Sequence, residues 1–370
     1  MRIGIFGGSF NPPHKGHVQA ASLAVSENKL DLLIVVPTGT PPHKQLPENS
    51  PEQKMRLEMT KNAFSELKNT IISDSEIFSA EPIFTIDTVG TIKNEYPDAE
   101  LFLLLGNDMH ESLLALKWKD SEKLLRLVTP ILLPRHVVDI SSTELREKLP
   151  LREGNEYIAD ENYSLIIKHR LYAAKPNWEW LRGKAHDMLV TSRIPHVDAC
   201  EIEAVRLAEC WNESVEDARE AAILHDITKK LDFSENLCII TSHGEKINDL
   251  KKGEEKLLHA VTGSLLAKSM FGMSDAVTEA IRWHTTGKFG MSMLEKIIYL
   301  ADYTESTRKF PGVEELRKKA YNNIDEAMLT GLEMTISDLL ARRISPSAVT
   351  YGALYDLSSR LSLGKTKETK

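Results

Sequence analysis

The pattern of apolar positions divides the chain into two parts. From residue 1 to about 172, short apolar runs alternate with helical patterns, and strands are predicted at 3–6, 32–36, 71–73 and 101–105. This alternation predicts a doubly wound α/β domain around a parallel sheet. After residues 173–177, which are typical of a linker, apolar residues recur at three- and four-residue spacing, for example at 199–210, 217–224 and 292–303. This spacing predicts core-facing helices, so we expect an α/β domain over 1–175 and an all-α domain over 182–360.

Two capping patterns predict where helices of the first domain begin. Ser50 is followed by Pro51 and Gln53, which suit a capping residue, a first helical turn and the return partner of a capping box. Ser141 and Glu144 form a second box. We therefore expect helices to start just after Ser50 and Ser141.

Composition narrows the class of protein. The chain has 370 residues, enough for two domains, and 46 basic against 54 acidic residues give a net charge of −8. This balance predicts no bulk attraction to nucleic acid or to a membrane surface. No apolar run approaches the ~18 residues of a membrane span, and the three cysteines suggest neither a disulfide framework nor a cysteine zinc site. We expect a cytoplasmic protein that binds neither nucleic acid nor membrane, with its oligomeric state, including a homo-oligomer, left open.

The stretch GGSFNPPHKGH at residues 7–17 carries the first chemical signal. Gly7 and Gly8 at a strand end allow close approach of the backbone to a ligand, and the prolines stiffen the loop. A helix predicted over 18–25 follows, and its first N–H groups would face the carboxyl end of the strand, where phosphate binds favourably. His14 and His17 would share one face there. The stretch predicts a phosphate site.

At these residues the sequence resembles the nucleotidyl-transfer family of adenylyltransferases. The H-x-G-H signature is His14-Lys15-Gly16-His17, and a second signature, I-S-S-T-x-x-R, is present at 140–146. The stretches PTGTPPHK at 37–44, FTIDT at 84–88 and GNDMHESLLALKW at 106–118 resemble the nicotinate-mononucleotide branch. The resemblance implies a Rossmann-like domain that transfers AMP from ATP, with Mg²⁺, to nicotinate mononucleotide, a step of NAD synthesis.

The chemistry agrees with these residue types, since in-line attack on an α-phosphorus needs two anions held together and no protein nucleophile. We assign catalysis to His14, His17, Lys44 and Arg146. ATP would be bound by Gly8, Ser9, Phe10, His17, Ser141, Ser142, Thr143 and Arg146. The resemblance places Thr85, Asp87, Asp108 and Trp118 around the nicotinate nucleotide, where an indole can stack on a pyridine ring. The segment before Ile140 is shorter than is usual in the family, so we expect a partly rebuilt adenine pocket.

A second set of chemistry-bearing residues lies in the helical half. Its members are histidines and aspartates within or beside apolar helical runs: His196, His225, Asp226, His259, His284 and Asp302. Burying an unpaired imidazole or carboxylate is costly, so six of them together predict a common partner, most economically a transition metal.

The order H…HD…D resembles the HD-domain phosphohydrolases, and His259 with the HTTG stretch at 284–287 resembles their YqeK-type branch. This resemblance implies symmetrical hydrolysis of diadenosine tetraphosphate to two ADP at a two-metal site, with iron expected. His196, His225, Asp226 and Asp302 would hold one ion, and Asp226 would bridge to a second ion held by His259 and His284. Such a pair lowers the pKa of a water and neutralises phosphate charge.

Two alternatives remain open at this point. The helical half can be a metal-stabilised module that senses a nucleotide without cleaving it. The first half can use another acceptor, such as nicotinamide mononucleotide, phosphopantetheine or a cytidylyl acceptor, although FTIDT and Trp118 count against the last two. Backbone N–H groups near Thr85 and Trp118 would favour nicotinate over nicotinamide.

Overall fold

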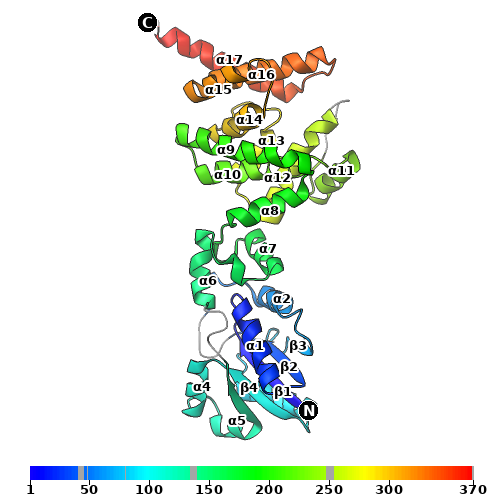
Figure 1. Ribbon diagram of the computed structural model, residues 1–370, viewed down its shortest axis with the longest axis vertical. Coiled ribbons are helices and arrows are strands. Elements are labelled where there is room, and N and C mark those ends of the chain that lie inside the picture. The colour runs from blue at the N-terminus through cyan, green and yellow to red at the C-terminus, as the bar shows by residue number, and fades with distance from the viewer. Residues whose placement is uncertain (41–45, 48, 80, 134–139, 247–253, 369–370) are drawn as a thin grey trace. The chain divides into compact units, whose positions relative to one another are not determined.

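The computed structural model describes residues 1–40, 46–47, 49–79, 81–133, 140–246 and 254–368 (Figure 1). The chain forms two compact units, Met1–Asn177 and Trp178–Lys370. The division falls at the end of the stretch 173–177, which the sequence suggests as a linker.

The first unit contains a five-stranded parallel sheet with the order β3-β2-β1-β4-β5. The strands are β1 Arg2–Gly8, β2 Leu32–Pro37, β3 Thr70–Ile72, β4 Glu100–Leu105 and β5 Val128–Leu132. The predicted α/β class and the four predicted strands are confirmed. The fifth strand, β5, was not predicted. It lies at the edge of the sheet, so its side chains are only partly buried and a proline, Pro130, is tolerated in it.

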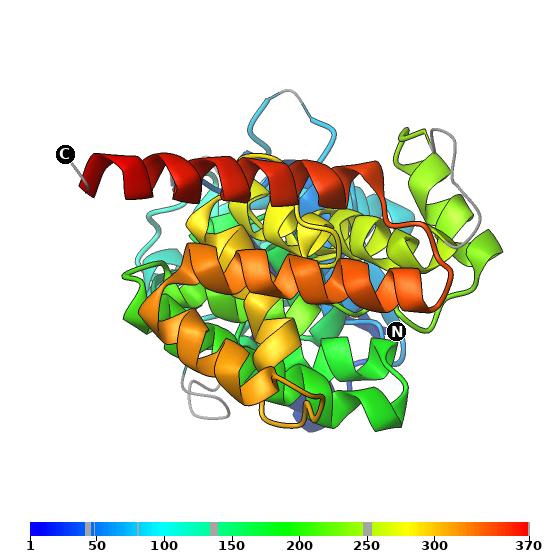
Figure 2. The same cartoon turned by 90° about the horizontal axis from the view of Figure 1, so that it is seen from above.

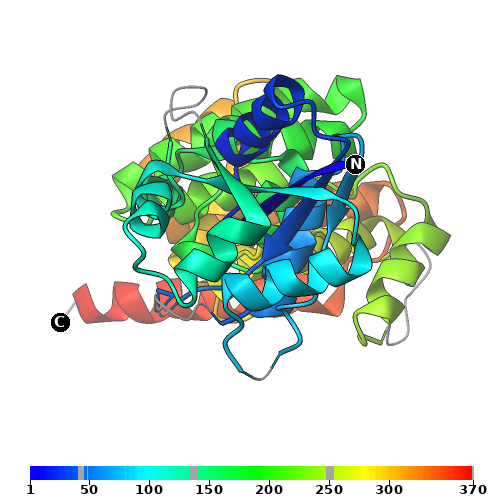
Figure 3. The same ribbon diagram turned by 90° about the horizontal axis from the view of Figure 1, so that it is seen from below.

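Helices cover both faces of this sheet (Figure 3). Ile3 and Ile5 of β1 point to one face and pack with α3 (Thr85–Glu95) and α5 (Ser121–Leu127). Phe6 points to the other face, where α1 (Lys15–Glu27) and the region of α2 (Gln53–Ala63) close a second core. The remaining elements are α4 Asn107–Leu114, α6 Ser142–Lys148, α7 Asp160–Lys168 and the 3₁₀ turns η1 Leu149–Leu151, η2 Asn155–Tyr157 and η3 Leu171–Ala173. The doubly wound arrangement leaves the carboxyl ends of the central strands open to a ligand.

The two predicted helix starts have different outcomes. The Ser141 box is confirmed: Ser141 Oγ accepts from the Glu144 N–H at 3.1 Å, and Glu144 Oε2 accepts from the Ser141 N–H at 2.7 Å. The Ser50 cap is wrong, because α2 begins only at Gln53 and the Ser50 hydroxyl accepts a hydrogen bond from Asn11 Nδ2 at 2.7 Å instead. The hydroxyl of Ser50, which was predicted to cap the helix, is thus bound by Asn11, a residue distant in sequence.

Within the described residues of the second unit, every regular element is a helix. These are α8 Trp178–Met188, η4 Thr191–Arg193, α9 Ile194–Cys210, α10 Val215–Leu224, α11 Phe233–Ser242, η5 Glu254–Leu257, α12 Leu258–Phe271, α13 Asp275–Trp283, α14 Met293–Thr304, α15 Val313–Asn322, α16 Ile324–Ala341 and α17 Ala348–Glu368. The helices predicted at 199–210, 217–224 and 292–303 are confirmed as α9, α10 and α14. Buried side chains of α9, α10, α13 and α14 form one continuous core, and α16 and α17 lie side by side (Figure 2). No described helix combines the length and apolar character needed to cross a bilayer.

Candidate active sites

The first site begins where β1 ends. His14 directly precedes α1 and His17 lies in its first turn, with the two ring centroids 3.7 Å apart. His17 Nδ1 accepts a hydrogen bond from the His14 N–H at 3.2 Å, which leaves its Nε2 as the donor toward a ligand. Burial lowers the pKa of His14 to about 4, and burial with the neighbouring His14 holds the pKa of His17 well below its usual value. At neutral pH both imidazoles therefore act as neutral hydrogen-bonding groups.

The start of α6 is tied to the same loop. Ser142 Oγ donates to the Pro12 carbonyl at 2.9 Å, across 130 residues of sequence. Arg146 Nη1 donates to the Asn11 carbonyl at 2.6 Å, and its Nη2 donates to Thr143 Oγ1 at 3.0 Å. The two signatures that the sequence analysis singled out thus lie together, although Lys44 and the segment 134–139 are outside the described residues.

Arg56 of α2 is a structural component of this site that sequence reasoning missed. It is fully buried, and its guanidinium donates to the carbonyls of Ser9 at 2.9 Å, Thr38 at 2.7 Å and Gly39 at 2.7 Å. These carbonyls belong to the loops after β1 and β2, so the Arg56 guanidinium links the two loops by hydrogen bonds. Its helix reads as mostly polar, and no local signal marks this position for burial.

A cavity of about 360 Å³ lies at the carboxyl ends of β1, β2 and β4, beside the start of α3. Four of the predicted ligand-binding residues line it: Gly8, Ser9, Thr85 and Trp118. Asp87 and Asp108 are not among its lining residues, and Phe10 packs its ring into the core beneath the loop, 5.2 Å from the ring centroid of His17. Glu76 and Lys119, which the sequence analysis did not single out, also line the cavity.

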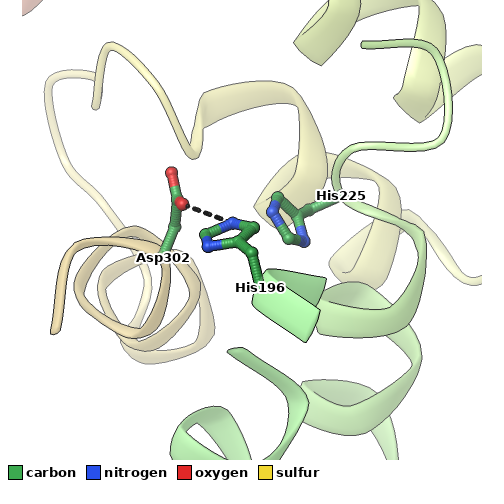
Figure 4. Close-up of side chains that lie close together, drawn as sticks. All are labelled: His196, His225 and Asp302. Carbon is green, nitrogen blue, oxygen red and sulfur yellow. Dashed lines mark ion pairs between the residues drawn. The ribbon is translucent and has the colours of Figure 1, made fainter. Parts of the chain in front are cut away.

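The second site gathers side chains from five helices of the second unit. His196 lies on α9, His225 and Asp226 follow α10, and the others lie on α12, at the end of α13 and on α14: His259, His284 and Asp302. His196 Nε2 is 3.0 Å from Asp302 Oδ1, and Figure 4 shows the His196 ring between Asp302 and His225. Ligand atoms of His196, His225 and Asp302 lie within 4.8 Å of one another, as do those of His225, Asp226 and His284.

The Nδ1 atom of each histidine has a partner that fixes the ring. Those of His225, His259 and His284 contact main-chain carbonyls three residues earlier at 2.7, 2.7 and 2.6 Å. Because a carbonyl only accepts, these Nδ1 atoms carry the proton, and each Nε2 lone pair points into the site. His196 differs, because its Nδ1 contacts the buried carboxylate of Glu305 at 3.0 Å. All four imidazoles are oriented as metal ligands are.

Asp226 is the centre of the set. Its Oδ1 lies 3.3 Å from His259 Nε2 and 3.7 Å from His284 Nε2, whereas its Oδ2 lies 3.5 Å from His225 Nε2 and 4.0 Å from His196 Nε2. Burial raises the pKa of this carboxyl, but the adjacent imidazoles outweigh burial and hold the pKa well below its usual value. Each oxygen of Asp226 therefore faces two imidazoles.

Three buried atoms of this set make no hydrogen bond of acceptable geometry within the described residues: His196 Nε2, His225 Nε2 and Asp226 Oδ1. Leaving a buried acceptor unpaired is costly. Imidazole nitrogens and carboxylate oxygens with free lone pairs are a suitable donor set for divalent transition metals. The residues present therefore fit a metal centre.

Three cations surround the six residues and were missed from the sequence. Arg193 forms ion pairs with Asp226, Arg308 Nη2 donates to Asp302 Oδ1 at 2.5 Å, and Lys229 Nζ lies 2.9 Å from His259 Nε2. Their side chains remain about a quarter to two fifths exposed, at 24%, 32% and 41%. The ligand set is thus closed on one side by buried imidazoles and bordered by accessible positive charge.

Family models match both parts of the chain. A cytidylyltransferase-like model matches residues 5–148, and an HD-domain model matches residues 193–307. A Mycoplasma genitalium protein named as a nicotinate-nucleotide adenylyltransferase/Ap4A hydrolase is 29% identical over 348 residues, covering 90% of this chain and 97% of the relative.

Other relatives match one half each. A nicotinate-nucleotide adenylyltransferase of Bacillus licheniformis is 33% identical and covers 46% of this chain and 98% of the relative. A symmetrical bis(5'-nucleosyl)-tetraphosphatase of Halalkalibacterium halodurans is 39% identical and covers 44% of this chain and 88% of the relative.

The chain is accordingly an enzyme that joins a nucleotidyltransferase domain of α/β type to a helical HD domain, the class of domain that binds divalent metal. It belongs to the nicotinate-nucleotide adenylyltransferase family through its first half and to the symmetrical bis(5'-nucleosyl)-tetraphosphatase family through its second half.

Proposed function

We propose that the first unit, functionally residues 1–175, transfers AMP from ATP to nicotinate mononucleotide. A phosphate oxygen of the acceptor attacks the α-phosphorus of ATP, and pyrophosphate leaves, so that the products are deamido-NAD and pyrophosphate. The observation that carries this proposal is the meeting of two helix starts, those of α1 and α6, at one loop beside a cavity that contains Trp118 and Thr85. Mg²⁺ would accompany the ATP.

In this reaction the residues hold charge and do not form bonds with phosphorus. Nε2 of His17 would donate to the α-phosphate as negative charge spreads in the transition state, with His14 beside it. Arg146 and the N–H groups at the start of α6 would bind the triphosphate, and Lys44 would add a further charge. Ser9 and Gly8 would contribute main-chain groups that Arg56 keeps in place.

We propose that the second unit, functionally residues 182–360, hydrolyses diadenosine tetraphosphate symmetrically to two ADP. Water attacks one of the two central phosphorus atoms, and the bond between the central phosphates breaks, leaving an ADP on each side. His196, His225, Asp226 and Asp302 would hold one ion, and Asp226, His259 and His284 a second. When bound, the two ions, which we expect to be iron, supply Lewis acidity toward the phosphates and lower the pKa of a water.

The protein residues around the ions have separate tasks. Glu305 keeps His196 in place, and the carbonyls at the helix ends keep the other three imidazoles in place. Arg193, Lys229 and Arg308 would bind the polyphosphate, since ions on Asp226, His259 and Asp302 would occupy the lone pairs that these cations contact here. Because these three cations are partly exposed beside the site, we favour a substrate that carries several negative charges.

The decisive experiment supplies the full chain separately with ATP plus nicotinate mononucleotide and with diadenosine tetraphosphate, and identifies the products by chromatography. We expect deamido-NAD with pyrophosphate in the first reaction and only ADP in the second. Formation of AMP with ATP from the second substrate would contradict symmetrical cleavage. Metal-dependent nucleotide binding without any turnover would support the sensing module instead.

A further inference from the structure

Lys119 lines the cavity of the first unit next to Trp118, on which the pyridine ring of the acceptor would stack in the proposed reaction. Lys119 Nζ lies 4.3 Å from the centroid of the Phe84 ring and 3.7 Å from Asp87 Oδ2. Phe84 directly precedes α3, and Phe84, Thr85, Trp118 and Lys119 all line the cavity. The ammonium group and the start of α3 therefore lie on the same side of the cavity.

The start of α3 adds to the positive potential of this wall. The first N–H groups of a helix have no intrahelical acceptor, and the helix dipole is positive at that end. Asp87 lies in the first turn of α3 and is not among the cavity-lining residues, and its carboxylate is 3.7 Å from the ammonium nitrogen. Asp87 holds the lysine beside the helix start.

The cavity also contains a carboxyl group, that of Glu76. Thr88 Oγ1 donates to Glu76 Oε1 at 2.7 Å, and burial raises the pKa of this carboxyl. Any negative charge on Glu76 disfavours an anionic ligand, whereas an amide N–H can donate to this carboxylate. Stacking on Trp118 does not distinguish an acid from an amide either. A preference for the acid therefore has to come from positive charge or N–H donors on the cavity wall, and a cation there would add to what the N–H groups at the start of α3 supply.

We propose that Lys119 binds the ring carboxylate of the acceptor nucleotide and makes the first unit select nicotinate over nicotinamide mononucleotide. The inference rests on the proposed adenylyl transfer. A carboxylate bound by both an ammonium group and helix N–H groups gains charge-assisted hydrogen bonds that the uncharged amide cannot replace. Because Lys119 would contact a charge present before reaction, its removal should raise KM more than it lowers kcat.

The test compares acceptors for Lys119→Met, which keeps the length of the side chain and removes its charge. We expect kcat/KM for nicotinate mononucleotide to fall about tenfold, the lower end of the range for a charged hydrogen bond because Lys119 is half exposed. The value for nicotinamide mononucleotide should change by less than about twofold. Lys119→Arg should keep most of the preference. Lys117→Met is the matched control, since this exposed lysine lies two residues away and does not line the cavity.

The possible outcomes separate a failure of the Lys119 inference from a failure of the proposed adenylyl transfer. An unchanged ratio in Lys119→Met, or an equal loss in Lys117→Met, overturns the inference while the proposed function stands. An equal loss with both acceptors means that Lys119 binds the phosphate that the two nucleotides share, and it also overturns the inference. If the wild-type chain adenylates neither nucleotide, the proposed function has failed and the inference falls with it. A melting temperature for each variant identifies a variant that is not folded.

Discussion

The two candidate sites are built from different kinds of groups. The first consists of helix starts, main-chain groups and two neutral imidazoles beside an open cavity. The second is a buried cluster in which four imidazoles and two carboxylates meet, with three atoms left without hydrogen bonds. In transfer between two phosphates the nucleophile is already an anion, so the protein needs only to hold and neutralise. Hydrolysis needs a nucleophile made from water, and a cluster of metal-binding lone pairs is suited to that task.

The sites also differ in how they depend on the fold. The first joins two short signatures, each continuous in sequence, through Ser142 and Arg146. The second depends on five helices spread from His196 to Asp302, and no two of its groups other than His225 and Asp226 are neighbours in sequence. Damage to one residue should therefore affect the second site more severely than the first.

The largest expected effect is that of Asp226→Asn. The change keeps the shape of the side chain but removes the charge that faces all four imidazoles, so metal content should drop to near zero and hydrolysis should fall by about a thousandfold or more. His259→Ala removes a ligand from one side only and should leave about one ion per chain. Metal analysis and ADP formation check both. A variant Asp226→Asn that keeps two ions would show that the carboxylate does not bridge.

His17→Ala should be next in size and confined to the first site. Loss of one donor to a developing charge typically costs about a hundredfold to a thousandfold in kcat. Hydrolysis of diadenosine tetraphosphate should not change, since the two sites lie in separate units. The measurement is kcat for both reactions of the same preparation, with His110→Ala on α4 as the control. A near-normal transfer rate would remove His17 from the mechanism.

Arg146→Ala should have a smaller effect, about tenfold to thirtyfold, mainly as a higher KM for ATP. The guanidinium would contact charge that is already present in the ground state, and it also holds the Asn11 carbonyl. Arg126→Ala, at an exposed position on α5, is the matched control. Steady-state kinetics with varied ATP decide the matter, and an effect confined to kcat would contradict a binding role.

The smallest effect concerns stability at acid pH. Because burial holds the pKa of His14 at about 4 against 6.5 in an unfolded chain, only the unfolded state takes up this proton between these values. The free energy of unfolding of the first unit should therefore fall by about 1.4 kcal/mol per pH unit as pH drops from 6.5 toward 4, and it should be insensitive to His14 above 6.5.

His14→Gln should remove this contribution. Hydrogen exchange in β1 and β4 of the full chain at pH 7 and pH 5 measures the difference between the wild type and the variant. An equal acid loss in both proteins would show that His14 is not the group responsible.

Local sequence determined much of this protein. Alternating apolar runs predicted the parallel sheet, and the Ser141 box and the helices α9, α10 and α14 followed from spacing and capping, because each depends on residues within a few positions of one another. The same holds for the loop at residues 7–17, in which His14 and His17 lie three positions apart in sequence. Their rings meet because the helix begins between them.

Tertiary structure decided the rest. The Ser50 hydroxyl accepts a hydrogen bond from Asn11 and does not cap α2, Asp87 lies 3.7 Å from Lys119, and the buried Arg56 donates to carbonyls of two loops. The sequence around Arg193, Lys229 and Arg308 does not predict that these side chains border the site, because a sequence pattern does not show where an arginine or lysine side chain points. Their roles depend on which side chains the fold brings within hydrogen-bonding distance: Arg193 and Lys229 contact groups 33 and 30 residues away in sequence, and Arg308 contacts Asp302 only six residues away because the chain turns after α14.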